Sequence, residues 1–341
     1  MVIALVSLCV VYNVNIKAVD IDDNTKIEVI IPSGTSKKNV GKILKENDLI
    51  RSSTFFEIYI KLFNVGDFKA STYYLSKDMD LKNIIETLEK GNSYNKDQIT
   101  ITFKEGINIR RLATIIKDNT NNSYDDVLNL LKDEKYLDEL IENYWFVTED
   151  IKNDKIYYSL EGYLFPDTYY FSNKDVSVKE IFSKMLNRME TVLAEYKEDI
   201  EKSELSIHEI ITLASIIEKE GKVRDFGKIS SVFYNRLKLK MTLGSCATAY
   251  YGMGMDFDEV GIATSEMMAN KNDYNTYVVA ALPVGPIALP GKNAILAAIK
   301  PEETDNLFFL SDNEGNSYFF KTIAEQTKKK NELIRDGKWE R

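Results

Sequence analysis

The feature that most constrains the fold is a short pattern that occurs twice in the chain, 72 residues apart. Residues 31–35 and 103–107 each close an apolar, strand-like run with a glycine-containing turn, and an amphipathic helical pattern follows each of them. Two copies are too few for a solenoid, which needs about three or more repeats. We therefore expect a pair of small α+β units. Their helices share apolar positions, which are Val40, Ile43 and Leu44 in the first and Leu112, Ile115 and Ile116 in the second.

The rest of the chain reads as a succession of helices with one stiff loop. A long amphipathic pattern covers Val176–Tyr196 after a polar stretch, so we place the main domain boundary near Asn173. Pro283, Pro286 and Pro290 exclude a regular helix and predict a stiff loop around residues 273–291. Further elements are expected as strands at 68–75, 307–310 and 318–320, and as helices at 81–88, 124–131, 135–144, 207–220, 229–239 and from residue 323 onward.

Composition excludes several classes of function. The net charge of −9 argues against a nucleic-acid surface. The single histidine, His208, nearly excludes Ser-His-Asp and Cys-His sites as well as His-based metal sites. We interpret His208, in the first turn of a predicted helix, as a surface or capping residue. Cys9 and Cys246 form no disulfide framework. No metal site and no cofactor is expected, so the chemistry must come from carboxylates, hydroxyls and amides.

The N-terminus begins with about a dozen apolar residues and no charge. A membrane-spanning helix needs about 20 such residues, and a signal peptide would begin with basic residues. We interpret residues 1–18 as part of a single-pass membrane anchor, with a buried strand or helix as the alternative. The remainder of the chain would then lie on one side of the plasma membrane, with the outer face favoured.

The segment Ile207–Glu220 predicts a helix with an acid on its apolar side. Ser206 and Glu209 have the spacing of a capping box. On a helical wheel Glu218 falls within the stripe formed by the isoleucines and Ala214, whereas Glu220 points about 160° away. Loss of hydration favours the protonated form of a carboxyl group, and a protonated acid is what general-acid chemistry on a sugar needs. The alternative is that Glu218 leans out to solvent or pairs with Lys219 or Arg224. We interpret Glu220 as exposed or supporting.

Taken together, several segments resemble the endolytic murein transglycosylase family (MltG, also called YceG-like). The order of the matching segments, over nearly the whole chain, makes the resemblance specific. They are Ile31–Gly34, Glu105–Gly106, Leu160–Tyr169, Leu213–Glu220, Val232–Leu237, Met241–Leu243 with Thr248, Tyr274–Tyr277, Leu282–Pro283, Gly285–Ile287 and Pro290–Gly291.

The resemblance implies a fold and an activity. The fold would be α+β, with a membrane anchor (1–18), LysM-like α+β units (19–173) and a catalytic domain (174–341). The enzyme would be a lytic transglycosylase that cuts peptidoglycan glycan strands internally between N-acetylmuramic acid and N-acetylglucosamine. Its product would carry a 1,6-anhydromuramic acid end, with the catalytic glutamate at Glu218. The implied partners are glycan strands, the membrane and cell-wall synthesis proteins.

Several polar residues in the matching segments are candidates for substrate binding. Hydrogen-bond donors and an aromatic ring suit a sugar with N-acetyl groups, although Arg236 could instead pair with Glu220 or Asp225. The chain departs from the family at Cys246 and Ala247, where many relatives have Asp-Pro, and at Ser317 and Gln326, where histidines are usual. The candidates are Asn235, Arg236, Ser245, Thr248, Asn275 and Tyr277.

Two other functions are compatible with the residues. One is a non-catalytic, LysM-like scaffold that binds peptidoglycan and merely buries Glu218. The other is a true hydrolase with a second acid such as Asp225 or Glu220, because ordinary glycosidases use two carboxylates.

Overall fold

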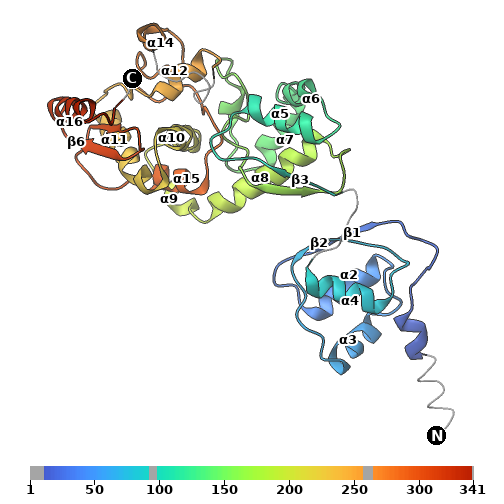
Figure 1. The fold of residues 1–341 in the computed structure, drawn as a ribbon. Coiled ribbons are helices and arrows are strands. Elements are labelled where there is room, and N and C mark those ends of the chain that lie inside the picture. The colour runs from blue at the N-terminus through green and yellow to red at the C-terminus, as the bar shows by residue number, and fades with distance from the viewer. Residues whose placement is uncertain (1–10, 92–97, 256–263, 340–341) are drawn as a thin grey trace, which may run out of the picture. The chain divides into compact units, whose positions relative to one another are not determined.

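The structure, a computed structural model, describes residues 11–91, 98–255 and 264–339, and the chain divides into two compact units. The first unit is Met1–Gln98 and the second is Ile99–Arg341 (Figure 1). Residues 1–10 of the predicted anchor lie outside the described residues. In the part of the chain that the structure describes, no helix combines the length and the apolar character that crossing a membrane requires.

The first unit packs helices against a two-stranded antiparallel sheet. β1 pairs with β2 so that Val29 lies opposite Tyr73, and both side chains are buried. The helices begin at capping side chains, which accept hydrogen bonds from the first-turn backbone and so fix where each helix starts. In chain order the elements are β1 (Ile27–Ile31), α2 (Lys37–Glu46), α3 (Ser53–Leu62), β2 (Ser71–Leu75) and α4 (Leu81–Lys90).

The second unit begins with the second copy of the repeat. Gly34 and Gly106 both adopt a positive φ, 79° and 76°, which a residue with a Cβ atom rarely adopts. β3 pairs antiparallel with β4, and α5 follows its glycine turn as α2 does in the first unit. The elements are β3 (Ile99–Thr102), α5 (Ile109–Asn119), α6 (Tyr124–Leu130), α7 (Glu134–Asn143), a 3₁₀ turn (Glu149–Lys152) and β4 (Thr168–Phe171).

The C-terminal elements gather around α10 (Ile207–Glu220), which packs against α11, α12 and α15 (Figure 1). All residues from Ile210 to Ile217 are buried, so α10 has no solvent face along most of its length. The neighbouring helices are α8 (Val178–Ala194), α9 (Lys197–Glu201), α11 (Phe226–Lys238), α12 (Cys246–Gly252), α14 (Ser265–Ala269), α15 (Lys292–Ile299) and α16 (Ile323–Arg335). A hairpin of β5 (Phe308–Ser311) and β6 (Ser317–Phe320) completes the described elements.

One hydrophobic core joins the second repeat to the C-terminal helices. It contains Ile101 and Ile116 from the repeat together with Ile217 from α10 and Ile295 from α15. The boundary expected near Asn173 therefore lies inside the second compact unit. This sharing of a core explains why only the first repeat separates as a unit of its own.

Candidate active site

Helix α10 carries two glutamates at its C-terminal end, and they face different surroundings. The predicted capping box is confirmed: Ser206 Oγ accepts from Glu209 N at 3.2 Å, and a Glu209 carboxylate oxygen accepts from Ser206 N at 2.8 Å. This capping box fixes where the helix starts. Glu218 and Glu220 lie in its last turn and point to different sides of the helix. Both side chains are partly buried.

Glu218 lies where the turn of the second repeat meets the proline-rich loop. Its Oε2 accepts the backbone N–H of Gly291 at 2.9 Å, and the turn glycine Gly106 lies close to its side chain. Burial raises the pKa of Glu218 to about 7, the Gly291 hydrogen bond opposes this, and the charge of Glu105 adds to it. Glu218 is thus a carboxyl group that holds its proton near neutral pH, as the helical pattern predicted.

Replacing Glu218 with Gln is expected to remove a pH-dependent loss of stability. A carboxyl with a pKa of about 7 when folded and about 4.3 when unfolded binds more protons in the folded state between these values. The free energy of unfolding therefore falls as the pH rises through that window. Glu218→Gln should match the wild type near pH 4 and exceed it by about 2 kcal/mol at pH 8, after allowance for partial exposure.

Urea unfolding at several pH values, followed by fluorescence of Trp145 and Trp339, measures this difference. Both tryptophans belong to the second unit, so the signal reports on the unit that contains Glu218. Glu142→Gln, at an exposed glutamate, serves as the control. Equal pH slopes for the wild type and Glu218→Gln would show that Glu218 has an ordinary pKa.

Glu220 faces a cavity of about 900 Å³. Its Oε1 accepts a hydrogen bond from the hydroxyl of Ser245, which is itself buried. Burial raises the pKa of Glu220, whereas the Ser245 hydrogen bond and the positive charge of Arg236 oppose this rise. Glu220 is therefore not the exposed residue that the helical wheel suggested. The cavity is lined by Lys219–Lys222, Phe233, Arg236, Leu243–Cys246, Ser265, Met268, Tyr277, Phe309–Ser311, Gly315, Gln326, Lys330 and Trp339.

Three of the six predicted substrate-binding residues line this cavity. They are Arg236, Ser245 and Tyr277. Tyr277 places its hydroxyl 3.0 Å from the thiol of Cys246, the residue that stands where the family usually has an acid. The sequence thus identified three residues that line one cavity, one from α11, one directly before α12 and one from the 273–291 loop.

The other three predicted residues hold the surrounding backbone. Thr248 is fully buried and shares a 2.8 Å hydrogen bond with the hydroxyl of Thr276. The Asn275 amide donates to three backbone carbonyls between residues 267 and 270, and the Asn235 amide donates to two carbonyls between residues 304 and 306. Buried polar groups need hydrogen-bond partners, and the side chains of these three residues find theirs in the surrounding loops.

Arg236 forms neither of the ion pairs considered from the sequence, within the described residues. Its guanidinium donates to the backbone carbonyls of Leu307 at 2.6 Å, Leu243 at 2.7 Å and Thr242 at 3.3 Å. Arg236 therefore connects α11 to the segment before β5 and to the segment before α12. Its positive charge also opposes the rise in the pKa of Glu220.

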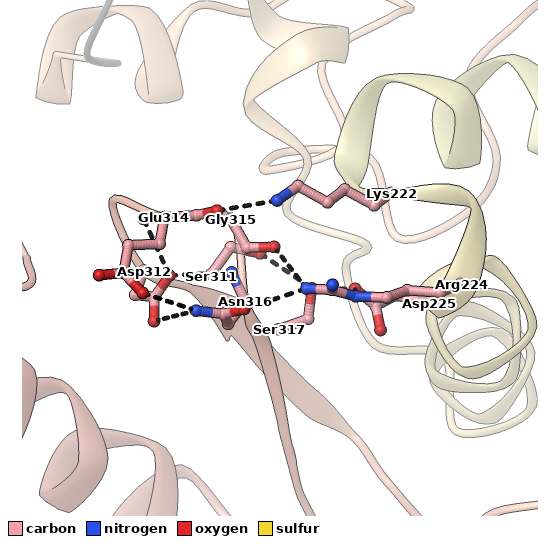
Figure 2. Close-up of polar contacts among 9 residues, drawn as sticks. All are labelled: Lys222, Arg224, Asp225, Ser311, Asp312, Glu314, Gly315, Asn316 and Ser317. Atoms are coloured by element: carbon pink, nitrogen blue, oxygen red, sulfur yellow. Dashed lines mark hydrogen bonds and ion pairs between the residues drawn. The ribbon is translucent and has the colours of Figure 1, made fainter.

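The chain that follows Glu220 is fastened to the turn of the β5–β6 hairpin (Figure 2). Within that turn, the backbone N–H of Asn316 lowers the pKa of Asp312 to about 2, so Asp312 remains a charged acceptor that shapes the turn. The hairpin thus forms a braced wall beside Glu220. The contacts run from Lys222 Nζ to Glu314 O (2.8 Å), from Arg224 Nη2 to Gly315 O (3.2 Å) and Asn316 Oδ1 (3.1 Å), and from Ser317 Oγ to Asp225 Oδ2 (2.9 Å).

The interpretation of His208 as a surface or capping residue is wrong. His208 is 7% exposed, and its ring nitrogens contact the hydroxyl of Tyr163 at 2.7 Å and the carbonyl of Val284 at 3.0 Å. These contacts could not be predicted from the sequence around His208, because both partners lie far away in the chain. His208 thus connects α10 to the segment that precedes β4 and to the proline-rich loop.

Glu161 is a buried acid whose contacts the sequence did not reveal. Its two carboxylate oxygens each lie 3.1 Å from the backbone nitrogen of Ile109, and one accepts from the Tyr251 hydroxyl at 2.9 Å. It therefore caps α5 and binds α12. Among the residues that the structure describes, no group of three or more His, Cys, Asp or Glu side chains could hold a metal ion.

Comparisons with known proteins agree with the resemblance read from the motifs. The family model described as "YceG-like family" matches residues 29–332. An endolytic murein transglycosylase of Bacillus subtilis (strain 168) is 38% identical over 321 residues, which cover 94% of this chain and 88% of that protein. An endolytic murein transglycosylase of Streptococcus pneumoniae serotype 2 (strain D39) is 30% identical, over 88% of this chain and 57% of its own length.

A solved structure has the same fold. The crystal structure of a yceG-like protein from Listeria monocytogenes matches with a TM-score of 0.65 and 34% sequence identity. The match covers 89% of this chain and 99% of that chain.

Proposed function

Because the chain belongs to the YceG-like family, we propose that it cleaves the bond between N-acetylmuramic acid and N-acetylglucosamine in peptidoglycan, leaving 1,6-anhydromuramic acid ends. The chain is an enzyme, a peptidoglycan lytic transglycosylase, in keeping with the relatives named endolytic murein transglycosylases. The anhydro product and the internal site of cleavage are parts of the proposal.

The observation that carries the mechanism is the position of Glu220 in the cavity. The Ser245 hydroxyl donates to Oε1 of Glu220, so a proton held by the neutral carboxyl would sit on Oε2. Burial raises the pKa of Glu220, which favours the protonated form that a general acid requires. The sequence alone assigns the acid to Glu218. That assignment stays a prediction, but the cavity favours Glu220 because Glu218 does not line it.

The reaction needs one carboxyl group that acts twice. Glu220 would donate its proton to the glycosidic oxygen as that oxygen leaves the anomeric carbon of muramic acid. The resulting carboxylate would then accept the proton of the muramic acid 6-hydroxyl while that oxygen bonds to the anomeric carbon. The nucleophile belongs to the substrate, so its attack gains the effective concentration of a tethered group. Glu220 is the one carboxylate among the described residues that line the cavity, and this mechanism needs only one.

Membrane attachment and glycan binding complete the proposal. We assign residues 1–18 to a membrane anchor that places the enzyme at the outer face of the plasma membrane. We propose that the two α+β units that share the repeat make LysM-like contacts with the glycan. The biological role would be to terminate nascent strands beside cell-wall synthesis proteins. The support for these assignments is the apolar N-terminal run and the repeat.

Product chemistry tests the proposal. We expect purified full-length protein, incubated with uncrosslinked glycan strands in ¹⁸O-labelled water, to release fragments that contain no ¹⁸O. Their muramic acid ends should be lighter by one water than reducing ends, because the 6-hydroxyl replaces water as the nucleophile. Mass spectrometry of the fragments reads both properties. Reducing ends that carry ¹⁸O would make the protein a hydrolase and would require a second acid.

A further inference from the structure

The cavity beside Glu220 is rich in positive charge, although the whole chain carries −9. Among its described lining residues, Glu220 is the one acid, and its raised pKa keeps it neutral over more of the pH range. A hollow lined by charges of one sign concentrates ligands of the opposite sign. The basic side chains that line it are Lys219, Lys222, Arg236 and Lys330.

Three of these cations are not neutralised by carboxylates. Within the described residues, Lys222, Arg236 and Lys330 form no ion pair. Lys222 donates to the carbonyl of Glu314 and Arg236 donates to carbonyls of both walls, whereas Lys330 lies 5.5 Å from the ring centre of Trp339. By contrast, the neighbouring Lys329 pairs with Glu332 at 2.6 Å. The cavity therefore offers cationic side chains that form no ion pair among the described residues.

The cations come from different elements that line the same cavity as Glu220. Lys222 follows α10 and braces the hairpin turn (Figure 2), and only one of its ammonium hydrogens is needed for the Glu314 carbonyl. Lys330 comes from α16, on the wall that also contains Trp339 and Phe309. A ligand that extends from Glu220 toward α16 would meet an aromatic surface and a cation together.

We propose that this cationic wall, with Lys330 as its main contact, binds a carboxylate of the peptide stem on muramic acid, so that the enzyme selects peptide-bearing strands. The inference rests on the proposed function and deepens it. In peptidoglycan the sugars of the repeating disaccharide are uncharged once the lactyl group is joined to the stem, and the carboxylates belong to the stem. A lysine ammonium attracts such a group as a point charge and does not require one geometry.

Kinetics on matched substrates test the proposal. The full-length protein is assayed on uncrosslinked strands with intact stems and on the same strands after their stem carboxylates have been converted to neutral amides. Removal of the stems by an amidase is not used, because it would leave a lactyl carboxylate on each muramic acid. We expect kcat/KM to be about twofold to fivefold higher on the strands with free stem carboxylates, mainly through KM, because one partly exposed charge pair has about that effect. The preference should narrow at about 0.5 M salt, where exposed charges are screened.

Two lysines on α16 provide a matched pair of variants. Lys330→Gln should abolish most of the preference by raising KM only on strands with free stem carboxylates, and Lys330→Arg should retain it. Lys328→Gln changes the same net charge on the same helix, but Lys328 is exposed and does not line the cavity, so the preference should remain. Equal effects of Lys330→Gln and Lys328→Gln, or equal cleavage of both substrates by the wild type, would overturn the proposal.

Binding measurements separate this proposal from the proposed function. Calorimetry of the same two strand preparations compares affinities without turnover. Binding that depends on the stem carboxylates, without any cleavage, would overturn the lyase assignment and leave the carboxylate site standing. Cleavage that does not depend on the stem carboxylates would overturn only the carboxylate site.

Discussion

Replacing Glu220 with Gln is expected to lower the rate of glycan cleavage about a thousandfold or more. Glutamine has the shape of glutamate and can still accept from Ser245, but it cannot donate a proton to the leaving oxygen or accept one from the 6-hydroxyl. Burial raises the pKa of Glu220, which favours the protonated form that the first step requires. Rates on uncrosslinked strands, with product ends identified by mass spectrometry, measure the loss.

The matched control lies two residues away on the same helix. Glu218→Gln makes the same chemical change at a carboxyl group that binds the Gly291 backbone and does not line the cavity. We expect its rate to stay within about tenfold of the wild type. Both variants should bind glycan strands as the wild type does. An inactive Glu218→Gln beside an active Glu220→Gln would restore the assignment made from the helical wheel.

Replacing Glu161 with Ala is expected to lower the free energy of unfolding by about 3 kcal/mol. Glu161 is 1% exposed, and its carboxylate accepts from the Ile109 backbone and from the Tyr251 hydroxyl. The variant would leave both donors buried without this acceptor, at the contact between α5 and α12. Urea unfolding at pH 7 measures the change.

Glu142→Ala is the control for this experiment, because Glu142 is exposed on α7 of the same unit. Its free energy of unfolding should stay within about 0.5 kcal/mol of the wild type. A loss below about 1 kcal/mol for Glu161→Ala would mean that the carboxylate does not hold the two helices together.

The sequence predicted best those features that neighbouring residues determine. The repeat, its glycine turns and the capping box of α10 depend on residues within a few positions of one another, and the structure has all three. Helix α15 was missed because Lys292–Ile299 is short and almost wholly apolar, with no polar face to give a helical period.

The choice between Glu218 and Glu220 could not be made from the sequence alone. The helical wheel selected Glu218 because it lies on an apolar stripe. However, α10 is buried on every side along most of its length, so the stripe does not show which of the two glutamates faces a cavity. Glu220 gains its position from Ser245, which lies in another segment. Likewise, Thr248 and Asn275 read as ligands for a sugar because nothing nearby in the chain shows the backbone groups that they bind.

A structure of Glu220→Gln bound to a peptidoglycan tetrasaccharide with its peptide stems tests the central claim most directly. We predict that the sugar occupies the cavity between α10 and the β5–β6 hairpin, with the glycosidic oxygen within hydrogen-bond distance of residue 220. A tetrasaccharide bound beside Glu218 and Gly291, with the cavity left empty, would contradict the account.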